Sequence, residues 1–427
     1  MSSKALEQIL NYFSSSNKNI LSQLKTVSHL CGGALLVAGT CIGAGMLGLP
    51  VSTAASGFYP TVSLFVLCWS IMTLTAFLML EVSLWFPNQS NLISMAKATL
   101  GKSGEVIAWI IYVLFLYSLM AAYTAGGGGI AAQHLTQFGL SEKLSLISYV
   151  LFFALIVYSG TRWVDFTNRI IMLGLLIAYF GLVYLVTPHI NSAQLHHRAS
   201  QYLLFTLPLM VTSFGFHLLI PSLKYYFKGN VNQLRIALFI GSLIPLVVYL
   251  AWEWIILGAI PLRGDNGLLS MLYHGNPAVE LSEGLKRLTQ SQAIPSLAKG
   301  FSFFAILSSF IGVALGLFDF FADGLKIKRH AFGKILLTLL TFIPPALFAY
   351  MYPTGFLYAL NYAGIFAAIL LIIYPALMVW WGRYHVKIAH GYQVAGGRLT
   401  PIIAIAFGIS VILMLVLSKM SLLPIPN

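Results

Sequence analysis

Three ionisable residues stand inside long apolar runs of this chain. Glu81 lies in FLMLEVSLW, His217 in SFGFHLLIP and Glu253 in YLAWEWII. An ionisable side chain is costly in an apolar medium and usually marks a function, such as proton transfer. Histidine titrates near ~6.5 in water, and a buried carboxylate can also exchange protons near neutral pH. All three residues are therefore candidates for proton uptake and release.

Each of these groups also has a structural explanation. Glu81 could instead hold a helix break through a hydrogen bond. Asp319 and Asp323 stand near the end of another apolar run, beside basic residues that could pair with them at the membrane interface: Lys326, Lys328 and Arg329.

Backbone groups form a second chemical feature, in the glycine-rich run GGALLVAGTCIGAGMLGLP (32–50). Glycine weakens a helix interior by ~1 kcal/mol and proline by ~3 kcal/mol, so the run predicts a helix that opens at Gly43-Ala44-Gly45. A second run, 205–226, carries a similar interruption at 213–217. Glycines also let membrane helices pack closely, which is the alternative role for Gly32, Gly33 and Gly39.

An opened helix at bilayer depth frees N–H and C=O groups that a ligand, a cavity or another helix must satisfy. The half-helix that starts near Met46 would point its positive dipole end at the gap, which suits a carboxylate. The carbonyls that end the preceding half-helices suit an ammonium group. Together these ends suit a zwitterion, which is an amino acid.

The elements that must position these groups are membrane helices. The chain has 427 residues, a mean hydropathy of +0.86 and only 8% charged residues, which indicates a polytopic membrane protein. We expect no cleaved signal peptide, because the first apolar run begins near residue 30. A further surface helix is expected near 278–288. The apolar runs predict eleven spans: 31–57, 60–86, 105–134, 143–160, 164–187, 202–226, 231–260, 296–322, 332–352, 355–381 and 400–422.

The distribution of basic residues predicts the orientation. With the N-terminus inside, 17 of the 24 Lys and Arg residues fall in inside segments and 7 outside. We therefore expect a cytoplasmic N-terminus and a periplasmic or extracellular C-terminus. The net charge of +13 is explained by these loops, so no nucleic-acid partner is expected. The three cysteines form no disulfide framework or metal-ligand spacing, and neither a metal nor a cofactor is expected.

The two interrupted helices suggest an internal repeat. Interrupted segments at matching positions of two halves point to a transporter site, and an odd number of spans in each half inverts the second half. The predicted organisation is a cytoplasmic tail (1–30), a first five-helix repeat (31–187), a second, inverted repeat (202–381) and an additional helix (400–422).

Four segments carry a family resemblance: GALLVAGTCIGAGMLGLP (33–50), TSFGFHLLIPSL (212–223), IGSLIPLVVYLAWEWIILGAIP (240–261) and FFAILSSFIGVALGLFDFFADGL (303–325). Together they resemble the bacterial aromatic amino acid permeases, the tyrosine- and tryptophan-specific transporters of the amino acid–polyamine–organocation superfamily. The resemblance implies an all-α leucine-transporter-like fold with 5+5 inverted repeats, eleven transmembrane helices and discontinuous helices 1 and 6. It also implies secondary active import by alternating access across the bacterial cytoplasmic (inner) membrane, coupled to protons. It requires no more than a monomer among the membrane lipids.

Carried over position by position, the resemblance implies a substrate site around the two breaks. Gly43, Ala44 and Gly45 would offer N–H groups to the substrate carboxylate. The substrate ammonium would meet carbonyls near Cys41, Val211 and Ser213. The remaining predicted members line the side-chain pocket: Phe214, Phe216 and His217 from the second broken helix, with Tyr117 and Tyr123 on the opposite wall or in ordinary packing.

The residues leave two alternatives for the coupling ion, a proton or sodium. His217, Glu81 and Glu253 are the proton-coupling candidates. An alternative sodium site would combine the carbonyls of Gly39 and Ile42 with the hydroxyls of Ser308 and Ser309, although small hydroxyl residues also pack helices well.

The sequence also allows alternatives in substrate and in class of function. Tyrosine is the favoured substrate and tryptophan the next, while sodium-coupled or exchange transport of another amino acid is an alternative. An intramembrane enzyme would show paired carboxylates, His–Asp motifs or metal-ligand spacing, whereas the ionisable groups here are scattered singly. A channel or receptor-like sensor does not need two broken helices. The run AGGGGIAA (125–132) lacks the Lys-Ser/Thr of a phosphate loop and indicates close helix packing.

Overall fold

The computed structural model describes residues 26–86, 90–264, 267–274, 277–286 and 293–420. The predicted tail up to residue 25, the end of the predicted helix near 278–288 and the last residues of the predicted final span lie outside these ranges. The described helices run in this order: Thr26–Cys41, α2 (Gly45–Thr53), α3 (Phe58–Leu84), α4 (Leu92–Leu135), α5 (Glu142–Ser159), α6 (Thr161–Val186), α7 (Ser192–Leu195), α8 (Leu207–Ser213), α9 (Ile220–Tyr226), α10 (Val231–Ala259), α11 (Leu268–His274), α12 (Pro277–Lys286), α13 (Ala293–Gly324), α14 (Ala331–Met351), α15 (Phe356–Ala367), α16 (Tyr374–Tyr384) and α17 (Leu399–Lys419).

Among the described residues, ten helices are long and apolar enough to cross a membrane, and the bent pair Thr26–Cys41 and α2 brings the number to eleven. Apart from the third, the predicted spans are therefore confirmed to within about five residues. The tenth span is α15 and α16 joined by a π-helical turn, Ala368–Ile373. The third is longer than predicted, because α4 also contains a short segment before Gly101, whose φ of 77° interrupts the helix.

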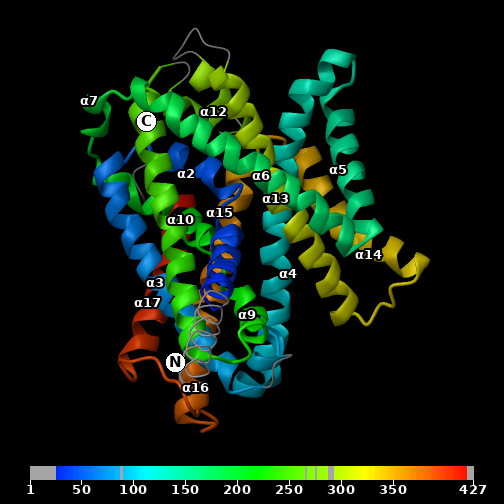
Figure 1. The fold of residues 1–427 in the computed structure, drawn as a ribbon, viewed down its shortest axis with the longest axis vertical. Helices are drawn as coiled ribbons and strands as arrows, with labels where there is room; N and C mark the ends of the chain where they lie inside the picture. The colour runs from blue at the N-terminus through cyan, green and yellow to red at the C-terminus, as the bar shows by residue number, and fades with distance from the viewer. Residues whose placement is uncertain (1–25, 87–89, 265–266, 275–276, 287–292, 421–427) are drawn as a thin grey trace, which may run out of the picture.

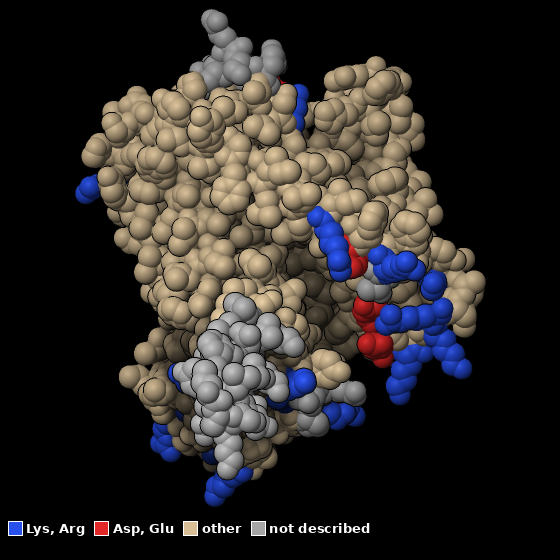
Figure 2. Space-filling view, in the orientation of Figure 1, with Lys and Arg blue, Asp and Glu red and all other residues tan. Residues whose placement is uncertain are grey.

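The long helices form a bundle whose two ends differ (Figure 1). The helices α2, α7 and α12 lie at one end, which we call the α2 end, and α9 and α16 lie at the opposite end, the α9 end. In the space-filling view, Lys and Arg side chains gather mainly over the lower half of the molecule, while most of the upper surface carries no charge (Figure 2). That distribution is expected for a chain whose apolar belt faces lipid.

The core lies where both broken helices cross the bundle. The helix α13 packs against α6 and α4, and α15 packs against α4 and α8. Small residues allow this close approach: a Cβ at Gly364 would collide with the Pro208 carbonyl, and one at Gly127 with the Tyr149 ring. The glycine run 125–132 therefore serves helix packing, as the sequence predicts.

The helix predicted near 278–288 is α12, and its described residues are not simply surface residues. Leu281 and Leu285 are almost fully buried, and α12 packs against α13, α4 and α2. One face of this short helix therefore closes over the α2 end of the bundle.

Candidate functional site

The first break lies between the helix Thr26–Cys41 and α2, which meet at an angle of 57°. Residues 42–44 are non-helical, and Gly45 is the first residue of α2. The Ala44 N–H donates to Ser309 Oγ over 3.0 Å. A Cβ at Gly43 would collide with the same Ser309 oxygen, and one at Gly45 would lie 3.0 Å from Ser213 Oγ. These glycines therefore let α13 and α8 approach the opened backbone.

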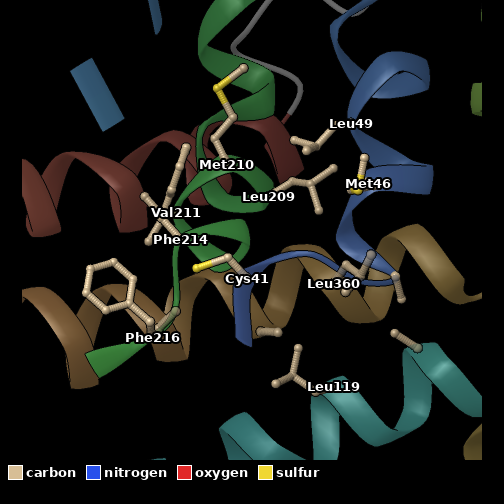
Figure 3. Close-up of a cluster of buried hydrophobic side chains, with 14 of the residues drawn as sticks. Cys41, Met46, Leu49, Leu119, Leu209, Met210, Val211, Phe214, Phe216 and Leu360 are labelled. Carbon is tan, nitrogen blue, oxygen red and sulfur yellow. The ribbon is translucent and has the colours of Figure 1, made fainter. Parts of the chain in front are cut away.

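The second break separates α8 from α9. The helix α8 ends at Ser213, and a tight turn follows in which the Phe216 N–H donates to the Phe214 carbonyl over 3.1 Å. A 3₁₀ turn, His217–Leu219, then leads into α9. The predicted opening of both helices is thus confirmed. Figure 3 shows the two breaks side by side, with Cys41 turned toward the segment that carries Val211 and Phe214.

One side chain connects the two breaks. The Tyr249 hydroxyl, on α10, lies 2.6 Å from the Cys41 carbonyl oxygen and 2.9 Å from the Ser213 carbonyl oxygen. These are two of the carbonyls that the sequence predicts for the substrate ammonium. Tyr249 itself was missed by the sequence reasoning. Its spacing to Trp252 and Glu253, at i+3 and i+4, places three polar-tipped residues on one helix face and could have identified it.

We call the place where the Tyr249 hydroxyl meets the Cys41 and Ser213 carbonyls the junction. Aromatic rings surround it. The Phe214 ring packs edge-on against Phe65 and Tyr249, with centroid separations of 6.3 and 5.4 Å. The Phe216 ring lies 5.2 Å from the His217 ring. Phe214, Phe216 and His217 are fully buried, and so is Val211. Four predicted members of the second broken helix therefore lie in an apolar region suited to an aromatic side chain.

The two tyrosines predicted for the opposite wall differ in position. Tyr123 is buried in α4, within hydrogen-bonding reach of the Ser309 side chain, and so belongs to the junction. Tyr117 is directed elsewhere, because its hydroxyl donates to the Leu340 carbonyl of α14 over 2.7 Å. The structure therefore brings Tyr123, and not Tyr117, to the breaks.

Of the proton-coupling candidates, His217 lies in the second broken helix and Glu253 contacts the first. His217 is fully buried, and its Nε2 lies 2.9 Å from the Thr75 hydroxyl of α3. Glu253 is also fully buried, and its Oε2 accepts a hydrogen bond of 2.8 Å from Thr53, the last residue of α2. Within the described part of the chain, Glu253 Oε1 has no hydrogen-bond partner.

The third candidate, Glu81, is paired with a cation. Arg383 donates to both Glu81 oxygens, over 2.7 and 2.6 Å, and the Val394 N–H donates to Oε2 over 2.7 Å. Both charged side chains are buried. This arrangement joins α3 to the end of α16 and to the loop before α17, which favours the structural role that the sequence left open for Glu81.

Asp319 and Asp323, in the last turns of α13, pair with a basic residue in the connection between α13 and α14. Arg329 lies 2.9 Å from Asp319 and 3.5 Å from Asp323. All three side chains are partly or largely exposed. The interfacial pairing expected from the sequence is therefore present, with Arg329 as the partner.

The residues of the alternative sodium site come from the first broken helix, which carries Gly39 and Ile42, and from α13, which carries Ser308 and Ser309. Ser308 Oγ donates to the Ala305 carbonyl over 3.1 Å, and Ser309 accepts from Ala44. The nearest atom to a Cβ at Gly39 would be the terminal methyl of Met172, on α6. A sodium-binding role for Gly39, Ile42, Ser308 and Ser309 stays a prediction.

A cavity lies at the α9 end. It has a volume of about 560 Å³, and its lining includes Leu218, Pro221, Ser222 and Asp319. The space-filling view also shows a hollow near the middle of the drawn face (Figure 2). Leu218 directly follows His217, so this cavity reaches the residue next to the second break.

The α2 end is covered instead. The α2 residues Met46 to Thr53 are all buried. The segment after α7 closes over the residues that follow α2, because the Ala199 N–H donates to the Ser56 carbonyl and His197 Nε2 lies 2.9 Å from the Ala55 oxygen. The structure thus has a cavity at the α9 end, while the residues of α2 at the opposite end are buried.

Known proteins of similar structure have the same architecture. The structure of MhsT in complex with L-phenylalanine superposes with a TM-score of 0.66 at 14% identity, covering 90% of this chain and 97% of that one. A manganese transporter of Eremococcus coleocola gives 0.62 at 15% identity, covering 93% and 87%. The leucine-transporter-like fold is confirmed by these similarities.

Sequence comparison is more specific. The chain is 36% identical over 382 residues to tyrosine-specific transport system 1 of Haemophilus influenzae, covering 88% of this chain and 94% of the relative. It is 34% identical over 404 residues to a tryptophan-specific transport protein of Pseudomonas aeruginosa, covering 92% and 96%. These relatives are transport proteins, which excludes the intramembrane-enzyme alternative. Residues 26–415 match the tryptophan/tyrosine permease family profile, and the chain is a member of that family of integral membrane proteins.

Proposed function

We propose that this protein is a secondary active transporter that imports an aromatic L-amino acid across the bacterial cytoplasmic membrane, with tyrosine favoured and tryptophan next. One observation carries the proposal. The carbonyls of Cys41 and Ser213, at the ends of two half-helices, meet within hydrogen-bonding distance of one buried hydroxyl in an aromatic environment. Helix C-termini attract cations, so the substrate ammonium group binds at these two carbonyls. The aromatic ring of the substrate then lies beside Phe214 and Phe216.

The names of the relatives support the substrate class. Both tyrosine-specific and tryptophan-specific proteins are among them, at comparable identities. The substrate carboxylate is then directed to the N-terminal end of α2, near Gly43, Ala44 and Gly45. The Ala44 N–H already donates to Ser309, so the carboxylate shares or replaces that bond.

Transport proceeds by alternating access between the two ends of the bundle. The cavity at the α9 end and the buried residues of α2 support assigning this arrangement to the state that faces the cytoplasm. In that orientation the N-terminus is cytoplasmic and the C-terminus periplasmic, in agreement with the bias of basic residues. The working unit is a single chain in the lipid bilayer.

Protons are the proposed coupling ion, with Glu253 and His217 as the groups that carry them. Both are buried, and each contacts a hydroxyl group on another helix: Glu253 contacts Thr53 of α2, and His217 contacts Thr75 of α3. Sodium is the second candidate, because Ser309 contacts the opened backbone directly.

The deciding experiment measures uptake of labelled L-tyrosine and L-tryptophan into proteoliposomes that contain the purified protein. Separate arms impose a pH gradient, a sodium gradient or neither. Accumulation that follows the pH gradient supports the proposal. Accumulation that follows sodium and ignores pH overturns the coupling assignment, and the absence of both accumulation and exchange of any aromatic amino acid overturns the function.

A further inference from the structure

The Tyr249 hydroxyl is shared between two acceptors. It is fully buried and lies 2.6 Å from the Cys41 oxygen and 2.9 Å from the Ser213 oxygen. A phenol has one hydrogen to donate, so it cannot make a full hydrogen bond to both carbonyls at once. The junction therefore contains more acceptor capacity than Tyr249 can satisfy.

The two carbonyls are also where negative charge gathers. Cys41 ends one half-helix and Ser213 ends α8. The last carbonyls of a helix lack intrahelical partners and carry the negative end of the helix dipole. A primary ammonium group offers three N–H donors and a full positive charge, and it suits this pair of carbonyls better than a neutral hydroxyl does.

The surrounding contacts hold Tyr249 in this position. Its ring packs against Phe214 and Phe65, with centroids 5.4 and 6.0 Å away. One turn later on α10, Trp252 Nε1 donates to the Met46 carbonyl over 3.0 Å. The helix α10 is therefore hydrogen-bonded to α2 through Trp252, and to the Cys41 and Ser213 carbonyls through Tyr249.

We propose that the Tyr249 hydroxyl occupies the position that the substrate ammonium group takes when it binds. The ammonium group then replaces the hydroxyl as the hydrogen-bond donor to the Cys41 and Ser213 carbonyls. Tyr249 is thus a positioning residue that keeps the two half-helix ends together until substrate replaces it. Substrate binding then frees the ends at Cys41 and Ser213 from α10, while Trp252 still holds α2. This inference rests on the proposed function, because it requires an amino acid at the junction.

The test compares binding to the purified full-length protein of L-tyrosine and of 3-(4-hydroxyphenyl)propionate, which lacks the ammonium group. The variant is Tyr249→Phe. The matched control is Tyr179→Phe, which removes another hydroxyl that donates to a backbone carbonyl, that of Val248, over 3.1 Å. Removing the competing hydroxyl should tighten L-tyrosine binding by about threefold to tenfold, the equivalent of one net hydrogen bond. The propionate should bind the variant and the wild type alike, and the control should change neither affinity.

Two other results of the binding measurements would overturn the inference, and they can be told apart. If the wild type binds L-tyrosine and Tyr249→Phe binds it equally or more weakly, this inference is overturned and the proposed function stands. If the wild type binds neither L-tyrosine nor L-tryptophan, the proposed function is overturned and the inference with it.

A second measurement avoids dependence on the variant's folding. Wild-type protein with ring-¹³C tyrosine is mixed with L-tryptophan, which carries no phenol, and the infrared difference spectrum is recorded. The proposal requires a shifted tyrosine C–O band, because the Tyr249 hydroxyl changes its hydrogen bonds on binding. A spectrum without a tyrosine band overturns the proposal.

Discussion

Thr53 at the end of α2 donates a 2.8 Å hydrogen bond to the buried carboxylate of Glu253 on α10. The bond joins the half-helix that follows the first break to a neighbouring long helix. It also places a protonatable group where any movement of α2 changes that group's surroundings. A displacement of α2 would therefore change the hydrogen bonding and solvation of this carboxyl group, on which its protonation depends.

Replacing Glu253 with glutamine should separate transport from the proton gradient. Glutamine keeps an acceptor for Thr53 but cannot bind or release a proton. Exchange of labelled for unlabelled tyrosine should continue, while accumulation driven by a pH gradient should fall about tenfold or more. Asp165→Asn is the control, since this exposed residue pairs only with Arg169 on the same helix among the described residues, and it should leave both measurements unchanged. Gradient-driven accumulation at the wild-type level in Glu253→Gln would remove Glu253 from the coupling mechanism.

Replacing His217 with asparagine should change how uptake varies with pH. The asparagine amide can still bond the Thr75 hydroxyl but does not titrate. Initial uptake rates between pH 5 and 8 provide the measurement, because the charge change of an ordinary histidine falls in this range. Thr75→Val tests the hydrogen bond without removing the imidazole. An identical pH profile for wild type and His217→Asn would show that His217 does not carry the proton.

Adding one methyl group at Gly43 should weaken substrate binding. The new Cβ would collide with Ser309 Oγ, which accepts the Ala44 hydrogen bond at the break. We expect the affinity for L-tyrosine to fall by about tenfold or more in Gly43→Ala, since atoms in a close-packed site cannot give way freely. Gly312→Ala is the matched control on α13, where a Cβ meets open space. Wild-type affinity in Gly43→Ala would exclude the first break from the site.

Breaking the Glu81–Arg383 pair should reduce stability rather than alter coupling. Arg383→Gln leaves the buried Glu81 carboxylate without its cation, which should cost about 3–5 kcal/mol of folding stability. The Glu81→Gln/Arg383→Gln double variant should recover part of the loss, because no unpaired charge remains. Thermal unfolding of the purified proteins measures both. The exposed pair of Asp165 and Arg169 provides the comparison, and Arg169→Gln should change stability by less than about 1 kcal/mol.

Cysteine labelling should report which end of the bundle is open. Ser222 is exposed and lines the cavity at the α9 end, whereas Ser56 is fully buried at the α2 end. In inverted membrane vesicles, a membrane-impermeant maleimide should modify Ser222→Cys and not Ser56→Cys. Protection of Ser222→Cys in inverted vesicles, with labelling in intact cells, would reverse the proposed orientation.

The sequence alone determined where the chain crosses the membrane and where two crossings open. Both properties are local: a span needs about 20 apolar residues in succession, and glycine and proline weaken a helix where they stand. The break after Cys41 and the one after Ser213 could therefore be located, within about one residue for the start of α2. The bias of basic residues is likewise a property of the sequence.

Only the tertiary structure decided which side chains meet those breaks. Tyr249 reaches the Cys41 carbonyl across 208 positions of sequence, and Ser309 reaches Ala44 across 265. Tyr117 and Tyr123 lie on one helix six positions apart, yet only Tyr123 is directed toward the junction, because α4 turns Tyr117 toward α14. Glu81, similarly, could be recognised as a buried charge but not as the partner of Arg383. Such contacts depend on how the helices pack, and packing is a property of the whole bundle rather than of any one segment.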